Sequence, residues 1–191
     1  MRPQREKLSR EASRLHSERP QPFDDARQSI KDVSDIFAGV AGTEAETHSR
    51  ARQLMRQVAP GLVWITMHDI DIAHAGTYSL YVDGIRRTDR LCAEMWKIIQ
   101  SEPEYAGKTT LLILPDFGRD ADDDPGGNGF QHHRTGDPLS RTTWLMALGP
   151  GIREGVVHDR PVDSVDLVPT IGSMMGFSAA LSRGTPIAEI V

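Results

Sequence analysis

Carboxylate and imidazole side chains follow two short apolar runs of this 191-residue chain, where they could act as metal ligands. Asp71 and His74 come shortly after the run at 61–67, and Asp116 comes shortly after the run at 109–114. Mixed Asp and His ligand sets hold Zn²⁺, Mn²⁺ and similar divalent ions in proteins. Such an ion polarises a phosphoryl or sulfuryl oxygen and lowers the pKa of a bound hydroxyl. The two clusters therefore predict a divalent metal site that serves ester chemistry.

A parallel sheet would bring the two clusters together. The runs at 61–67 and 109–114 are continuously apolar and rich in β-formers, which is typical of strands buried on both faces. A long helix is predicted between them, from about Thr77 to Ser101. Strand, crossover helix and strand form a βαβ unit, whose two strands are parallel. Because ligands bind outside the carboxyl ends of such strands, we expect both clusters at one edge of the sheet.

The other predicted elements surround this unit. Helices are expected at 24–38, 43–58 and 164–175, the second with Ala51, Leu54, Met55 and Val58 inward. A third strand is expected at 142–148, after a polar loop at 115–141 that is long enough to be functional. Residues 1–22 are expected to form a charged tail or frayed helix, and the domain itself is expected to span 23–191. The expected fold class is α/β: a partial doubly wound α/β/α sandwich with a mostly parallel sheet, preceded by N-terminal helices.

The composition excludes several classes of protein. Hydrophobic residues make up 38% and charged residues 26% of the chain, which is typical of a globular domain rather than a disordered one. A net charge of −5 argues against a nucleic-acid binder. No apolar run is long enough to span a bilayer, and the single cysteine, Cys92, allows no internal disulfide. The charged N-terminus does not predict a secretory signal, so a cytoplasmic location is expected.

Several motifs between Gly61 and the C-terminus occur together in one family. They include Leu148-Gly-Pro-Gly-Ile152, Pro161-Val-Asp-Ser-Val-Asp-Leu-Val-Pro-Thr-Ile171, Gly176-Phe177 and Arg183-Gly-Thr-Pro-Ile-Ala-Glu189. The Asp-rich turn that contains Asp71 and the segment Asp116-Phe-Gly-Arg119 complete the set. This part of the chain resembles the alkaline phosphatase and sulfatase superfamily, which also contains nucleotide phosphodiesterases.

The resemblance implies a doubly wound α/β/α sandwich that holds two divalent ions near a Ser or Thr nucleophile. It implies that Asp71 and His74 are ligands of one ion and that Asp116 is a ligand of the other. Either His132 or His133 would be the late histidine that returns to the first ion. The ion itself is left open among Zn²⁺, Mn²⁺ and Ca²⁺.

Two features depart from the family pattern. Phe117 stands where many members have a second histidine ligand, and a phenylalanine ring cannot ligate a metal. Residues 1–60 predict helices, with no buried strand leading to a Ser or Thr nucleophile. We therefore expect this chain to correspond either to the C-terminal portion of a larger enzyme or to the product of a gene that has lost its front.

Two hypotheses of function follow. The first is a metal-dependent hydrolase of phosphate or sulfate esters, incomplete as an isolated chain, in which Arg119 holds the anionic group of a small substrate. Alternatively, Arg119 forms a salt bridge to Asp120 or Asp122 in its own loop. The second hypothesis is a non-catalytic remnant or a metal- or anion-binding module that needs a partner chain. Since an uncovered sheet edge invites association, either a homo-oligomer or a partner chain that completes the sheet is expected.

Overall fold

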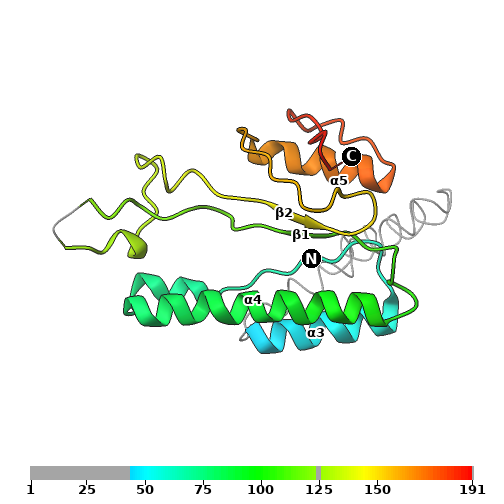
Figure 1. Cartoon of the computed structure of the whole chain (residues 1–191), viewed down its shortest axis with the longest axis horizontal. Coiled ribbons are helices and arrows are strands. Elements are labelled where there is room, and N and C mark those ends of the chain that lie inside the picture. The colour runs from blue at the N-terminus through cyan, green and yellow to red at the C-terminus, as the bar shows by residue number, and fades with distance from the viewer. Residues whose placement is uncertain (1–43, 124–125, 191) are drawn as a thin grey trace, which may run out of the picture. The chain divides into compact units, whose positions relative to one another are not determined.

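The computed structural model describes residues 44–123 and 126–190 (Figure 1). The chain divides into two compact units, 1–70 and 71–191. The expected tail at 1–22 and helix at 24–38 lie outside the described residues. Along the chain the described elements are α3 (Glu44–Val58), η1 (Asp69–His74), α4 (Tyr78–Ser101), β1 (Leu111–Ile113), η2 (Gly129–Gln131), β2 (Met146–Leu148), η3 (Ser164–Asp166) and α5 (Leu167–Met175).

In the first unit, the helix prediction is confirmed and the strand prediction is wrong. The helix α3 buries Ala51 and Met55, which lie four residues apart and therefore on the same helix face. Residues 62–68 form irregular backbone instead of the strand expected at 61–67. An apolar run favours a strand, but a strand exists only where a neighbouring strand pairs with its backbone N–H and C=O groups.

The long helix α4 agrees closely with its sequence prediction. It begins after Thr77 and ends at Ser101, and the N–H of the next residue, Glu102, still donates to the carbonyl of Ile98. Its apolar stripe is buried only toward the C-terminal end, where Met95 and Ile99 are each 3% exposed. The first turn contains Tyr78, which is 62% exposed.

The sheet corrects the predicted fold class. Among the described residues it has two strands, β1 and β2, which pair antiparallel with Leu111 opposite Leu148 and Ile113 opposite Met146. Neither the βαβ unit nor a mostly parallel doubly wound sandwich is present in this part of the chain. The loop that follows β1 folds back along itself and returns the chain beside β1 in the opposite direction (Figure 1). Strand direction thus depends on the path of this loop, which the apolar runs do not encode.

The C-terminal helix was predicted at 164–175, and the structure forms it as η3 followed directly by α5. Asp163 and Asp166 make a capping box, in which each side chain accepts from the backbone N–H of the other. Gly176 ends α5 with a φ of 75°, a left-handed conformation that glycine adopts without steric cost. These local signals explain why this helix could be located from the sequence.

The second unit exposes much apolar surface. Val157 is 91% exposed and Leu181 is fully exposed. The two-stranded sheet also leaves one edge of each strand without a strand neighbour among the described residues. No helix in the described part of the chain is long and apolar enough to cross a membrane.

Thr170 connects α5 to the C-terminal segment. Its side chain is fully buried, and its hydroxyl donates to the carbonyl of Asp166 at 2.6 Å and accepts from the N–H of Ile187 at 2.9 Å. Thr170→Val keeps the volume but leaves the buried N–H of Ile187 without a partner. We expect the free energy of unfolding to fall by about 1–3 kcal/mol, measured by urea denaturation. The exposed Ser173→Ala on the same helix is the control, and equal effects of the two changes would contradict this role.

A bidentate ion pair joins Arg160 to Glu189 near the C-terminus. The guanidinium donates from Nε to Oε1 at 2.6 Å and from Nη2 to Oε2. These hydrogen bonds are the main reason that the pKa of Glu189 falls from its usual 4.5 to about 2.

The depressed pKa of Glu189 makes a pH-dependent contribution to stability. A carboxyl whose pKa is lower in the folded state stabilises the fold above its unfolded value, and this contribution is lost as the pH falls from about 4.5 toward 2. We expect Glu189→Gln to lower the melting temperature at neutral pH and to converge with the unmodified protein in acid. Thermal unfolding across this pH window measures the difference, with the exposed Glu154→Gln as control. A difference that does not depend on pH would contradict the ion pair.

Candidate functional site

The one-turn helix η1 brings Asp71 and His74 together. They are three residues apart in a 3₁₀ turn, where side chains at i and i+3 lie on the same side. The carboxylate Oδ1 of Asp71 lies 4.0 Å from Nε2 of His74. Both side chains are partly exposed, so the pair is open to a third group. Their proximity follows from local spacing alone.

The third group is Arg119, which comes from the loop after β1. Its Nη1 lies 3.3 Å from Nε2 of His74, and its Nη2 lies 3.5 Å from Oδ1 of Asp71. Only 13% of the Arg119 side chain is exposed, against 57% of the Asp71 side chain. The structure thus places a largely buried cation against the two predicted ligands. Its ion-pair partner is Asp71, and not the Asp120 or Asp122 considered from the sequence.

The hydrogen bonds of His74 fix which ring nitrogen carries its proton. Nδ1 lies 2.7 Å from the carbonyl oxygen of Gln131, and because a carbonyl oxygen only accepts, Nδ1 is the donor. In the neutral ring Nε2 then has the lone pair, which accepts the N–H of Arg119. The side chain of Gln131 donates to the carbonyl of Gly76 at 3.1 Å, which holds this segment against the end of η1.

The structure also separates the two histidines that the sequence left equivalent. The ring of His133 packs edge-on against His74, with centroids 4.9 Å apart, and lies 4.2 Å from the ring of Phe117. His132 instead accepts, through its backbone carbonyl, a hydrogen bond from the N–H of Asp120 at 3.1 Å. His133 therefore belongs to the cluster with Asp71, His74 and Arg119.

Asp116 does not join this cluster. Its Oδ1 accepts a hydrogen bond from the N–H of the next residue, Phe117, at 3.0 Å. Across residues 44–123 and 126–190, no group of three or more His, Cys, Asp or Glu side chains is arranged to hold a metal ion. The guanidinium of Arg119 contacts both Asp71 and His74 and places a positive charge beside the pair. The described donor set therefore does not fit a divalent ion as it stands.

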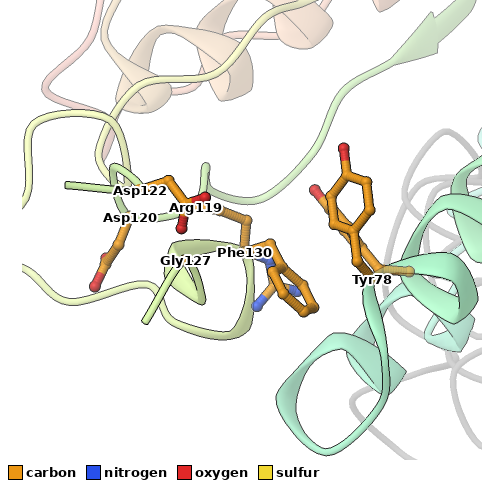
Figure 2. Close-up of a pocket in the computed structure, with 7 residues that line it drawn as sticks. Tyr78, Arg119, Asp120, Asp122, Gly127 and Phe130 are labelled. Carbon is orange, nitrogen blue, oxygen red and sulfur yellow. The ribbon is translucent and has the colours of Figure 1, made fainter. Parts of the chain in front are cut away.

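An open cavity of about 520 Å³ lies next to Arg119 (Figure 2). Three aromatic rings form one part of its lining, those of Tyr78 and Tyr81 on α4 and Phe130 on η2. The ring of Phe130 meets Tyr78 edge-on at 5.3 Å and stacks with Tyr81 at 5.8 Å. The guanidinium of Arg119 lies over the ring of Tyr81, 5.8 Å from its centre.

Sequence reasoning did not assign these aromatic residues to a site. Tyr78 and Tyr81 begin the apolar stripe of the helix predicted from about Thr77 to Ser101, and their spacing fits a buried face equally well. The signal available was their position, because both lie in the first turn after the Asp71–His74 segment. Phe130 lies far from them in sequence, so its contact with their rings comes from the folding of the loop.

Acidic residues of the loop after β1 accept hydrogen bonds from other residues of the same loop. The carboxylate of Asp120 is 4% exposed and accepts from the hydroxyl of Ser140 and from the N–H of Arg134, whose guanidinium lies 3.2 Å from its Oδ2. Burial alone raises the pKa of Asp120, but these hydrogen bonds and the charge of Arg134 outweigh burial and hold the pKa below its usual value. Asp122 accepts from the N–H of Gly129 at 2.8 Å. These acids stabilise the backbone that carries Arg119.

Comparison with protein families, with characterised proteins and with solved structures finds no match. The resemblance to alkaline phosphatases and sulfatases therefore remains a prediction from the motifs, and the geometry of the cluster carries the functional argument.

Gly118 is required by the close approach of two loop segments. An added Cβ would lie 2.0 Å from the carbonyl oxygen of Leu139 and 2.5 Å from that of Thr142, and neither backbone atom can turn away. We expect Gly118→Ala to lower the free energy of unfolding by about 1–3 kcal/mol and to speed amide exchange in the loop at 116–142. Gly136→Ala is the matched control, since nothing lies within 4 Å of its Cβ. Similar exchange in both variants would contradict the tight packing.

Proposed function

We propose that the Arg119 cluster binds the phosphate or sulfate group of a small anionic ester, and that the chain acts as a binding module. The observation that carries this proposal is the largely buried guanidinium of Arg119 at the edge of an open cavity. A guanidinium matches the geometry of phosphate and sulfate oxygens and can donate two parallel hydrogen bonds to them. A small anionic substrate and this role of Arg119 were also expected from the sequence.

The surroundings of Arg119 hold it in one orientation while leaving donors free. One N–H faces His74 and one terminal nitrogen faces Asp71, and the rings of Tyr81 and Phe117 each lie 5.8 Å away. Within the described part of the chain, Nε–H has no protein partner. A guanidinium held in place loses little side-chain entropy when it binds an anion, which favours binding.

The charges around the cavity predict modest affinity. Asp120 lines the cavity, but its carboxylate is paired with Arg134 and turns away from the aromatic rings (Figure 2). Asp122 is exposed and its negative charge opposes an anion. We therefore expect binding that weakens as salt increases, because salt screens exposed charges.

The aromatic rings suit the organic part of the ester. Tyr78 is 62% exposed beside Phe130, so a large share of its surface is available to an apolar or planar group. Stacking or edge contacts between aromatic groups are worth about 0.5–1.5 kcal/mol beyond area burial. The cavity thus pairs one cationic anchor with an apolar surface.

The state of His74 supports binding rather than turnover. Its Nδ1–H is donated to Gln131, and its Nε2 lone pair already accepts from Arg119. A general base needs a free lone pair within reach of the proton that it removes. In this arrangement His74 positions Arg119 instead.

A metal-dependent hydrolase is the second candidate, and one observation favours it. Histidines that ligate metals usually donate their other ring nitrogen to a carbonyl or carboxylate, as His74 does to Gln131. Hydrolysis of aryl phosphate or aryl sulfate that requires an added divalent ion would favour this candidate over the binding module.

Substitution of Arg119 tests the proposal. We expect Arg119→Ala to weaken the binding of phenyl phosphate and phenyl sulfate about tenfold or more, since charge-assisted hydrogen bonds contribute about 1.5–3 kcal/mol. Arg119→Lys should recover part of the loss, because it keeps the charge but not the planar fork. NMR titration of the full chain measures the affinity, with the exposed Arg153→Ala as control. Unchanged affinity in Arg119→Ala would exclude the proposed site.

A further inference from the structure

The guanidinium of Arg119 lies beside the pair formed by Asp71 and His74 and faces the ligand atoms of both. Oδ1 of Asp71 and Nε2 of His74 are 4.0 Å apart, close to the separation of about 3.3 Å that two ligands of a tetrahedral zinc ion have. Nη2 and Nη1 of Arg119 lie 3.5 Å and 3.3 Å from these same two atoms. The arginine therefore places its positive charge against the same two atoms that would ligate an ion, at hydrogen-bond and not metal-ligand distances.

We infer that Arg119 is a built-in substitute for a divalent cation, and that it keeps this cluster closed to metal ions. Arginine is permanently charged, so its positive charge pairs with the carboxylate of Asp71, and its N–H donates a hydrogen bond to Nε2 of His74. Both this inference and the proposed function involve Arg119, but the inference does not require that the chain binds an ester.

Displacing Arg119 would be costly. The side chain is 13% exposed, and its guanidinium carbon lies over the rings of Tyr81 and Phe117, 5.8 Å from each ring centre. An incoming ion would take over Asp71 and leave a largely buried guanidinium without its counter-ion, which is strongly unfavourable. The arginine thus competes with any metal that approaches the cluster.

Removing Arg119 should instead create a metal site. Asp71 and His74 would keep their orientation, because His74 is held by the carbonyl of Gln131 and not only by the arginine. The ring of His133 lies 4.9 Å from that of His74, but among the described residues no third His, Cys, Asp or Glu completes a metal site, so the pair would supply two ligands. A carboxylate and an imidazole are both ligand types that Zn²⁺ and Co²⁺ accept.

The test is titration of the full chain with Zn²⁺ alone by calorimetry, and with Co²⁺ alone by absorption spectroscopy. We expect Arg119→Ala and Arg119→Gln to bind one ion at least about tenfold more tightly than the unmodified protein, with Co²⁺ bands typical of imidazole ligation. Arg119→Lys should show no gain, because the ammonium keeps a positive charge in the same place. Arg119→Ala and Arg119→Gln are both tested, so that the result does not depend on the folding of a single variant.

Double variants identify the ligands. Adding Asp71→Asn or His74→Gln to Arg119→Ala should abolish the gain, whereas adding the exposed Arg153→Ala should not. The inference is overturned if folded Arg119→Ala and Arg119→Gln bind Zn²⁺ no more tightly than the unmodified protein, or if the gain survives loss of His74. The proposed function fails separately, through ester titrations in which Arg119→Ala changes nothing.

Discussion

The pairing of Arg119 with Asp71 and His74 is the interaction on which the arrangement of the candidate site depends. A guanidinium that is largely buried must find a negative partner and acceptors for its N–H groups, since an uncompensated buried charge is strongly unfavourable. The contacts with Asp71 and His74 meet this need and join η1 to the loop after β1. The cavity forms beside this junction, where the aromatic rings of α4 and η2 meet.

A second constraint, the hydrogen bonding of backbone N–H groups, explains why the acids of the long loop do not act as a ligand set. A polar loop that folds back on itself must satisfy many backbone N–H groups. Asp120, Asp122 and Asp137 each accept a hydrogen bond from a backbone N–H within the loop. Their carboxylates therefore stabilise the backbone of the loop that carries Arg119.

Much of the helical structure could be predicted because its signals are local. The period of the apolar residues located α4 almost to the residue, and the acids around Asp163 located the start of the C-terminal helix.

The sheet was predicted wrongly because strand pairing is non-local. The run at 61–67 has the composition of a strand and forms none, while β1 pairs antiparallel with β2. Composition favours a strand, whereas the pairing partner depends on the path of the intervening chain.

The candidate site likewise combines one contact that local spacing sets with others that depend on the tertiary fold. The sequence by itself determined that Asp71 and His74 lie together, because three residues of a 3₁₀ turn place them on one side. Only the tertiary structure decided that Arg119 contacts both of them, that the ring of His133 packs against His74, and that Asp116 accepts a hydrogen bond from its neighbour Phe117. These residues lie more than forty positions away from η1, and their approach depends on how the loop after β1 folds. Local spacing can therefore assign a pair of side chains, but which third group completes the pair is a property of the folded chain.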